Sequence, residues 1–340
     1  MLESIDMLTK TTEPSAKCDP LDDALHDLRV AGSVLLHESY AAPWSIDIPD
    51  ENRLRAMLGI DTALRVVLFH FVRRGRFELH MPGGDIVTIS SPQVAICSVG
   101  AAHRMSCGKG ARPVSIERVL QGQGPARSRH PSGEETELVC GAFFLNASPL
   151  NPLLGALPQL MIVNTGDPSF SPMLAGVAWM LAHEIDRQAL GGFTVGRLLE
   201  LFCAEAIRAH LRDGGAHQTG WFKGLADPRI ANAIGRVHAE PGRAWTVDEL
   251  ASGASLSPSL FAACFRAATG IPVMTYVAHW RANVACRLLQ DSSLSLSAIA
   301  GKVGYESHPA FTRAFRAQIG QPPAAWRSAR LLRGRSSART

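Results

Sequence analysis

Five residues near the C-terminus share one face of a predicted helix, opposite an apolar stripe that contains Phe311 and Phe315. These five are His308, Pro309, Thr312, Arg313 and Arg316. An arginine at such a position can bond guanine O6 and N7, and threonine or histidine can bond bases or phosphate. The pattern therefore predicts a surface that reads DNA, with Arg313 as the main base contact.

The same pattern occurs 50 residues earlier in the chain. The segments SLSPSLFAACFRAATGIP and YESHPAFTRAFRAQIGQP, which begin at Ser255 and Tyr305, match at both phenylalanines, the arginine, the glycine and the final proline. The equivalent face of the first copy holds Ser259, Ala262, Ala263 and Arg266. Alanine cannot hydrogen-bond to a base, although it can contact a thymine methyl group. We therefore expect the first copy to read less sequence than the second.

Each copy is predicted to form two helices joined by a tight turn, which is a helix-turn-helix unit. Thr246 and Glu249 have the spacing of a capping box at the start of the first unit. Ser257 and Ser307 can cap the second helix of each unit. The second helix of the first copy is expected to bury Leu260, Phe261, Cys264 and Phe265.

A single helix is predicted between the two copies, from Met274 to Gln290. At 1.5 Å per residue it would be about 25 Å long. A spacer of that length can hold two recognition helices in successive turns of the major groove, about 34 Å apart. Arg281 is expected on its outer side, as a phosphate contact.

Charge is divided unequally along the chain. Residues 225–340 contain 14 Lys and Arg against 6 Asp and Glu, a net charge of +8, whereas residues 1–224 contain 20 against 24. A basic back half indicates a polyanionic partner. The seven scattered cysteines include no C-x-x-C pair, which favours a reducing cytoplasm and argues against disulfides and structural zinc. No run approaches the roughly 20 apolar residues of a membrane span.

The front part consists of short β-rich runs separated by Gly and Pro. LRVVLFHFV, GRFELHMP, DIVTIS, QVAICSV and VSIERVL are predicted strands of a sandwich or barrel, with a hairpin turn at Gly83-Gly84. Two helices with apolar faces follow. The predicted fold class is α+β: a β-barrel or jelly roll followed by helices, then an all-α domain of two helix-turn-helix units joined by a long helix.

The segment from Val237 to Arg327 resembles the double helix-turn-helix domain of AraC/XylS-family transcription regulators, most clearly in IAGKVGYESHPAFTRAFRAQIGQPPAAWR. The resemblance implies base-facing positions at Ser259, Ala262, Ala263, His308, Pro309, Thr312 and Arg313. The family usually has glycine in the first turn, where this chain has Ser255. A left-handed residue there would cost serine more than glycine and would reshape the first unit slightly.

The front half is similar to the cupin-type N-terminal domain of one AraC-family subgroup, through APWSIDIP, FHFVRRG, PGGDIVTI, AAHRMS and ELVCGAF. Cupins often bind a divalent metal through histidines of adjacent strands, so the resemblance makes His70 and His103 candidate ligands of Zn, Fe, Ni or Mn. The usual H-x-H pair is absent, because Phe69 and Phe71 flank His70. The preferred alternative is a ligand pocket in which both histidines are hydrogen-bonded.

Relatives in this subgroup that resemble reactive-chlorine sensors use cysteines of the cupin domain, and Cys140 lies at one such position. The partner cysteine expected near the first strand is missing, since Val34 and its neighbours occupy that stretch. Cys107 is the second redox candidate, with Arg104 and Lys109 as nearby positive charges.

A cupin dioxygenase or isomerase fused to a DNA-binding domain is the alternative function, with His70 and His103 as iron ligands. The sequence offers it neither a third ligand nor a nucleophile motif. We therefore predict a cytoplasmic transcription activator and no enzyme. Its expected partners are double-stranded promoter or operator DNA, RNA polymerase, a small-molecule or oxidant signal and a second copy of the chain, with no membrane.

The predicted organisation follows these changes of pattern. It comprises a flexible N-terminus at 1–19, the cupin-like sensor domain at 20–165, a helical pair for dimerisation at 166–212, a linker at 213–224, the DNA-binding domain at 225–330 and a basic tail at 331–340.

Overall fold

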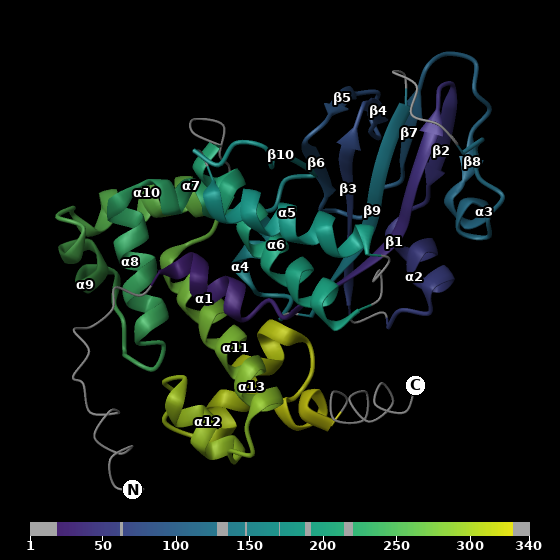
Figure 1. Cartoon of the computed structure of the whole chain (residues 1–340). Coiled ribbons are helices and arrows are strands. Elements are labelled where there is room, and N and C mark those ends of the chain that lie inside the picture. Colours follow the sequence, from purple (N-terminus) through teal and green to yellow (C-terminus); the bar gives the residue numbers. More distant parts are fainter. Residues whose placement is uncertain are drawn as a thin grey trace, which may run out of the picture. The chain divides into compact units, whose positions relative to one another are not determined.

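The computed structural model describes residues 19–61, 64–127, 135–146, 148–169, 171–187, 192–213 and 220–328 (Figure 1). The chain forms two compact units. The first is Asp27–Phe222, and the second combines Met1–His26 with Lys223–Thr340. The expected basic tail lies outside the described residues, as do the expected flexible N-terminus apart from Asp19 and residues 214–219 of the expected linker.

The first unit is built around two five-stranded sheets. One has the order β1-β9-β3-β6-β10, with strands Val30–Ala41, Glu135–Leu145, Arg65–Arg74, Gln93–Cys97 and Leu160–Asn164. The other has the order β5-β4-β7-β2-β8, with strands Ile86–Ser90, Arg76–His80, His103–Cys107, Trp44–Ile48 and Val114–Ser115. Neighbouring strands are antiparallel apart from β2 and β8. These sheets, together with the helical second unit, confirm the predicted α+β class.

Strand β3 is an apolar run because both of its faces are covered. Every residue of its VVLFHFV run is buried. Alternate residues of this run face a core shared by both sheets, namely Val66, Leu68 and Val72. By the two-residue period of a strand, His70 points the same way. The outer face of the sheet packs against α6 (Phe193–Asp213), so closely that a Cβ on Gly32 of β1 would lie 2.5 Å from Leu199 Cβ. Helix α5 (Pro172–Asp186) packs on α6 (Figure 1).

One predicted strand is largely a helix. In VSIERVL only Val114–Ser115 is β-structure, and α3 occupies Ile116–Leu120. Ile116 and Val119 are its buried residues, and their separation of three is a helical spacing. The prediction of a strand there is wrong because so short an apolar run fits either period.

The hairpin expected at Gly83-Gly84 is confirmed. Both glycines have positive φ, 104° and 96°, in the turn between β4 and β5, a backbone region that is open to glycine and costly for other residues. Two further helices of the first unit lie outside the predicted elements, α2 (Glu51–Leu58) and α4 (Pro152–Ala156).

The second unit is helical throughout its described part outside turns. Besides α1 (Pro20–His26), helices α7 to α13 are Gly220–Ala226, Pro228–Ala239, Val247–Gly253, Pro258–Thr269, Val273–Asp291, Leu296–Lys302 and His308–Ile319. Helices α9–α10 and α12–α13 form the two predicted helix-turn-helix units, and α11 joins them. Helix α7 starts at Gly220, inside the expected linker.

The predicted helix ends are confirmed. Thr246 and Glu249 form a reciprocal capping box at α9. The side chains of Ser257 and Ser307 accept from the backbone of Leu260 and Ala310 at the starts of α10 and α13. Both of these helices end at left-handed glycine caps, Gly270 and Gly320, with φ values of 82° and 85°.

The apolar stripe of α10 is narrower than predicted. Phe261, Phe265 and Ala268 are buried, at the i, i+4 and i+7 spacing of one helix face. Cys264 flanks this stripe and is half-buried, whereas Leu260 is 52% exposed. The prediction that Leu260 faces inward is wrong, because it lies about 100° around the helix from Phe261.

Among the described residues, no single helix is both long and apolar enough to cross a membrane. Only α10 and α11 taken together, with a bend of 55° between them, satisfy the length and composition criteria.

Candidate functional site

Three arginines are available to a partner. They lie on α10 and α13, the second helices of the two helix-turn-helix units. Arg266 on α10 and Arg316 on α13 are equivalent in the repeat, and Arg313 lies one turn before Arg316. All three are exposed. Within the part of the chain that the structure describes, no hydrogen bond or ion pair engages their side chains. They retain the full donor capacity that guanine or phosphate recognition requires.

Other arginines of the second unit are engaged within it. Arg229 pairs with Asp227 at 2.7 Å. Arg243 pairs with Glu249 at 3.2 Å and lies over the Trp245 ring. Basic residues of this unit thus divide into a group that stabilises the fold and a group that is free on the recognition helices.

Arg281 belongs to the first group, contrary to its predicted place on the outer side of α11. It is half-buried, and its Nε and Nη2 donate to the carbonyls of Pro241 and Arg243, both at 2.8 Å. Its guanidinium also lies 5.7 Å from the centre of the Tyr305 ring. Most of its donors are therefore used inside the unit, which leaves it a weaker phosphate candidate than the exposed arginines.

The remaining predicted DNA-binding residues differ in accessibility. His308, Pro309, Ser259 and Ala263 are exposed, and Ala262 is half-buried. Thr312 is also half-buried, and its hydroxyl oxygen is inaccessible to solvent and has no hydrogen-bond partner among the described residues. In this rotamer Thr312 therefore does not present the predicted hydroxyl to the surface.

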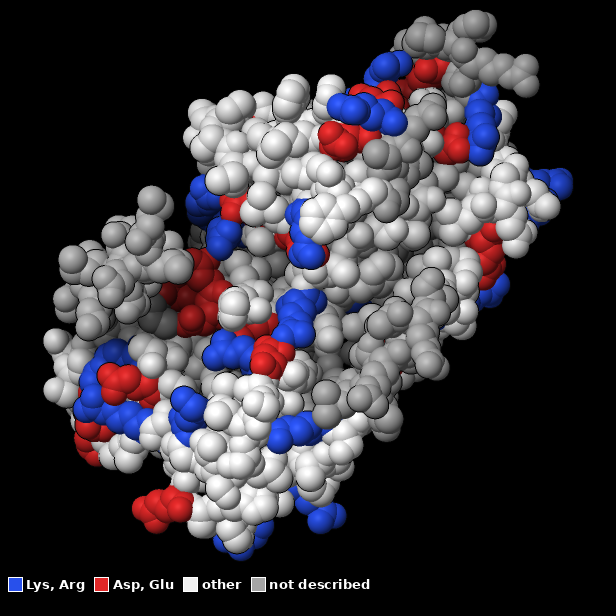
Figure 2. Space-filling model, turned by 60° about the horizontal axis from the view of Figure 1, so that its bottom comes forward, with Lys and Arg blue, Asp and Glu red and all other residues white. Residues whose placement is uncertain are grey.

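Charges on the surface follow the same division. Figure 2 shows Lys and Arg side chains on one face of the molecule, many of them beside an Asp or Glu. In the second unit such neighbours include Arg229 with Asp227 and Arg243 with Glu240. The net charge of the second unit therefore overstates how much positive charge is free to contact DNA. The unpaired arginines of α10 and α13 are a better guide to the DNA-binding surface.

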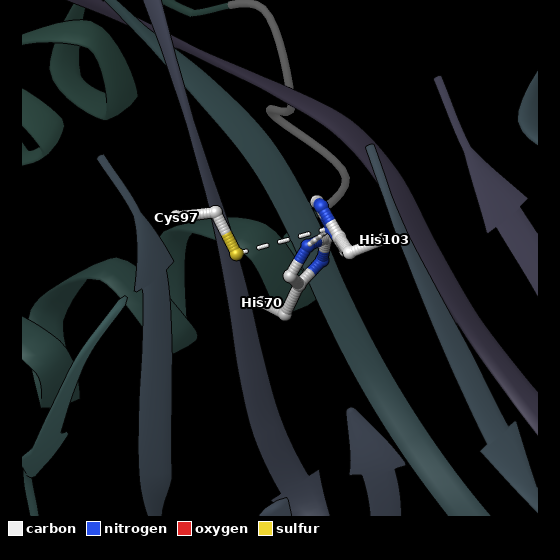
Figure 3. A group of neighbouring side chains, drawn as sticks. All are labelled: His70, Cys97 and His103. Atoms are coloured by element: carbon white, nitrogen blue, oxygen red, sulfur yellow. Dashed lines mark hydrogen bonds between the residues drawn. The ribbon is translucent and has the colours of Figure 1, made fainter. Parts of the chain in front are cut away.

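The first unit contains a buried polar cluster between its two sheets (Figure 3). His70 on β3 lies opposite Cys140 on β9 and next to β6, whose last residue is Cys97. His103 is the first residue of β7, in the other sheet. These four side chains are at most 5% exposed. Because β-strand residues alternate, His70, Cys97 and Cys140 all face the interior from the same sheet.

The contacts in this cluster form a chain. His70 Nδ1 lies 3.1 Å from Cys140 Sγ, and His70 Nε2 lies 2.9 Å from His103 Nε2. His103 Nδ1 lies 2.9 Å from the Ala101 carbonyl oxygen, and Cys97 Sγ lies 3.8 Å from His103 Nε2. A carbonyl only accepts, so neutral His103 carries its proton on Nδ1 and directs a lone pair from Nε2 into the cluster.

Burial keeps the four groups neutral. It lowers the pKa of His70, as does the neighbouring His103. It also lowers the pKa of His103, and the hydrogen bond that His103 donates to the Ala101 carbonyl opposes this shift. Burial raises the pKa of Cys97 to about 12 and also raises that of Cys140. A reactive thiolate requires a lowered pKa and some exposure, and Cys140 has neither.

The two predicted redox cysteines lie in different surroundings. Cys140 contacts His70, whereas Cys107 is half-buried at the end of β7, paired with Trp44 of β2. Arg104, predicted to supply charge to Cys107, is paired with Asp47 at 2.6 Å. The redox role of both cysteines stays a prediction.

Cys97 was not among the predicted site residues, although it completes the cluster. The signal that could have found it is its position: Cys97 lies on the predicted strand QVAICSV and precedes His103 by six residues. A connection this short keeps the end of one strand near the start of the next. His70, Cys97 and His103 each offer a metal-ligating atom, and the three atoms lie within 4.8 Å of one another. Two imidazoles and a thiol suit Zn and Cu better than the Fe or Mn of oxygen-rich sites, so the residues present fit a metal ion.

Known proteins resemble both units. Residues 19–212 match the cupin family, and residues 250–329 match a helix-turn-helix domain. An AraC-like transcription regulator of Streptomyces lividans is 28% identical over 314 residues, which is 91% of this chain and 98% of that protein. The RCS-specific HTH-type transcriptional activator RclR of Escherichia coli is 27% identical over 267 residues, 78% of this chain and 85% of that protein.

Among solved structures, the DNA-binding domain of AdpA in complex with a target DNA is 33% identical to this chain in the aligned part. The alignment covers 32% of this chain and 96% of the AdpA domain, with a TM-score of 0.30. The cupin match alone covers more than half of the chain, and relatives named as regulators align over nearly its whole length. The chain therefore belongs to the AraC family of DNA-binding transcription regulators, with a cupin domain on its N-terminal side.

Proposed function

We propose that this regulator recognises its promoter site chiefly through α13 and uses α10 mainly for docking. The observation that carries this is the distribution of free arginines. Arg266 and Arg316 stand at equivalent places, so each unit can contact phosphate. Arg313 of α13 stands where α10 has Ala263, and of these two side chains only the arginine can bond guanine O6 and N7.

Selection of DNA fragments by the full chain, followed by footprinting, tests this proposal. We expect two contacted segments about one helical turn apart, with stronger base preference in the segment under α13. Arg313→Ala should relax the preference at one base pair. Arg229→Ala is the matched control, because Arg229 is paired with Asp227 and lies on α8, outside both helix-turn-helix units. Equal base preference in both segments would contradict the proposal.

We further propose that the cupin domain receives the signal at the cluster of His70, Cys97, His103 and Cys140. A chain of polar contacts across the interior of a β-sandwich links both sheets, so a change at one member alters the packing of both. The name of the E. coli relative, which specifies RCS, supports a reactive oxidant as the signal; a small molecule is the alternative. Because the Cys140 thiol is buried and neutral in this structure, its oxidation requires a local opening of the sandwich. Mild oxidant should then change operator affinity in the wild type, at a rate limited by that opening, and not in Cys140→Ser.

The proposal includes a homodimer. Helices α5 and α6 expose large apolar side chains, with Met173 56%, Trp179 69% and Phe193 80% exposed. Large exposed apolar side chains on two packed helices favour a protein partner. Sedimentation of the full chain should give a dimer, and Trp179→Glu should shift it to the monomer, whereas Arg187→Glu, at the end of α5, should not.

We also propose that the bound protein activates transcription through RNA polymerase in the cytoplasm, where its operator DNA lies. The E. coli relative is named as a transcriptional activator, which supports this sign of regulation. Transcription in vitro from the selected site, with purified polymerase, should rise when the chain is added. A fall would make the protein a repressor.

A further inference from the structure

A hollow of about 370 Å³ lies in the second unit, where one face of α10 meets the start of α11. Helix α10 ends at its left-handed cap Gly270, and a bend of 55° separates it from α11. The corner between the two helices is closed on a further side by the start of α9. The lining comes from these three helices and includes Val247, Ala262, Arg266, Pro272, Val273 and Met274.

Small side chains on α10 keep this corner open. Ala262 and Ala263 both line the hollow. In the other helix-turn-helix unit the equivalent positions of α13 carry the larger side chains of Thr312 and Arg313. The alanines that deprive the first unit of hydrogen bonds to bases therefore provide space for another molecule.

The lining combines apolar surface with one positive charge. Val273 is buried, Val247 is half-buried and Met274 is 43% exposed. Among the described residues that line the hollow, Arg266 alone carries a charge, and no described hydrogen bond or ion pair engages its side chain. Ligand sites are concave and mostly apolar, with a few polar groups that orient the ligand. The hollow has this composition, and its volume lies within the usual range of about 300–1,000 Å³.

We propose that the hollow binds a compact amphipathic anion, which places its apolar body against Val247 and Met274 and its carboxylate on Arg266. A guanidinium binds a carboxylate through two parallel N–H···O bonds, and the apolar body removes the lining from water. DNA complements only part of this surface. A phosphate can pair with Arg266 but offers nothing apolar to the interior, and a thymine methyl group is a single carbon.

The bound anion opposes the docking of α10 on DNA, a consequence that rests on the proposed function. That function assigns Arg266 to a phosphate, and one guanidinium cannot form the same pair of bonds with the ligand and with the DNA backbone. Because linkage between two ligands is reciprocal, operator DNA should weaken binding of the anion by the factor by which the anion weakens operator binding. The hollow is thus a second input to the regulator, separate from the cluster in the cupin domain.

Calorimetric titration of the full chain with naphthoate tests the site, and naphthamide, its uncharged counterpart, tests the role of the charge. We expect naphthoate to bind with a Kd below about 1 mM. Naphthamide should bind at least about 10-fold more weakly, since it forms no charge-assisted pair with the guanidinium. Equal affinity for the two probes, or no binding of naphthoate at about 1 mM, would overturn the inference.

Variants of the two helix-turn-helix units assign the charge to one arginine. Arg266→Gln should weaken naphthoate binding about 10- to 100-fold and leave naphthamide binding unchanged. Arg316→Gln is the matched control, because Arg316 is the equivalent exposed arginine of α13; it should bind naphthoate like the wild type. Ala262→Leu should prevent binding of both probes by filling the hollow. If Arg266→Gln binds naphthoate as tightly as the wild type, the inference is wrong.

Methionine methyl groups provide a readout on the unaltered chain. In a magnetic resonance spectrum of isotope-labelled methionine methyl groups, the Met274 signal should shift when naphthoate is added, and Met274→Leu identifies that signal. Met173 and Met180 on α5 are the controls, since their exposed fractions of 56% and 40% bracket the 43% of Met274. A shift confined to methionines of the cupin domain would place the probe there and overturn the inference.

Operator binding measured on the same samples separates this inference from the proposed function. Saturating naphthoate should raise the operator Kd of the wild type. Binding of naphthoate in the hollow with an unchanged operator Kd would overturn the proposed docking role of Arg266 and leave the ligand site standing. A Met274 signal that shifts with operator DNA, in a chain that binds no naphthoate, would do the reverse, because the hollow would then hold DNA.

Discussion

Ser255 occupies, in the turn between α9 and α10, the backbone position that Gly304 occupies between α12 and α13. Ser255 has φ 55° and Gly304 has φ 81°, and each donates its N–H to the carbonyl three residues earlier. Ser255 is the one described residue other than glycine with positive φ. The first turn, however, reaches its serine cap two residues after this position, and the second turn reaches it three residues after.

Ser255→Gly should stabilise the second unit. Relief of the left-handed conformation is worth about 1–2 kcal/mol for a non-glycine residue, and the greater freedom of glycine in the unfolded chain costs about 0.5–1 kcal/mol. We expect a net gain of about 0.5–1 kcal/mol in urea unfolding. A destabilised variant would show that the serine side chain has a favourable role that outweighs this strain.

Gly304→Ala, at the equivalent position, should be strongly destabilising. A Cβ there would lie 2.5 Å from the Gly242 carbonyl oxygen and 2.9 Å from Arg281 Nη2, at an unfavourable φ. We expect a loss of about 2–4 kcal/mol in the same unfolding measurement, from strain and overpacking together. Gly301→Ala is the control, because a Cβ at Gly301 would meet nothing within 4 Å.

Arg281→Ala should act on stability before it acts on DNA. Two hydrogen bonds to backbone carbonyls and the contact with the Tyr305 ring would be lost, for about 1–3 kcal/mol. Thermal unfolding of the DNA-free chain checks this. An unchanged melting temperature combined with weaker DNA binding would restore Arg281 as a phosphate contact.

Arg313→Ala and Arg316→Ala should weaken operator binding in different ways. A lost base contact at Arg313 costs about 1–3 kcal/mol and relaxes specificity at one position. A lost phosphate contact at Arg316 weakens all sequences alike and lowers the salt dependence of log K by about one. Titrations of matched and mismatched operators at several salt concentrations distinguish the two. Identical behaviour of the two variants would remove Arg313 from base reading.

The second unit should lose stability as the pH falls below about 6.5, through His238 on α8. This imidazole is buried, donates or accepts at 2.8 Å with the Tyr276 hydroxyl, stacks on Trp280, and lies 3.4 Å from an Asp23 oxygen of α1. Burial lowers its pKa below the ordinary 6.5, and Asp23 opposes that shift in part. The folded chain therefore binds fewer protons than the unfolded chain at mildly acidic pH, so the free energy of unfolding decreases there and is constant above about pH 7.5.

Urea unfolding of His238→Gln between pH 5 and 8 checks this dependence. The variant should be less stable at neutral pH but should lose less stability on acidification than the wild type. His308→Gln, which changes an exposed histidine of α13, should follow the wild-type profile. A pH dependence that is identical in all three proteins would assign the effect to other groups.

The helix-turn-helix pair could be predicted almost completely because its signals are local. Caps such as Ser257 and Ser307, and stops such as Gly270 and Gly320, act within one turn of the residues that they control. Which arginine side chains form hydrogen bonds inside the unit could not be predicted. Arg281 and Arg313 are both arginines on predicted helices, and only the three-dimensional path of residues 241–243 decides that the first is engaged and the second is free.

The buried cluster could be predicted only in part, for a topological reason. The family resemblance predicts His70, His103 and Cys140 as site residues, but it does not indicate Cys97. Cys97 joins them because β6 pairs with β3 in a particular register, Leu68 opposite Cys97. A shift of one residue would have turned the thiol to the other face of the sheet. Strand periodicity in the sequence fixes which residues share a face but not which strands become neighbours.

Helix α1 belongs to the second unit, although in the sequence it precedes the whole of the first unit. During synthesis α1 leaves the ribosome early, whereas its partner α8 is translated about 200 residues later, a delay of about 10–40 s at 5–20 residues per second. The cupin sheets can form in that interval while α1 has no docking surface. The DNA-binding unit is therefore completed only after the cupin segment has been synthesised, so a nascent chain can hold a folded sensor domain before it can bind DNA.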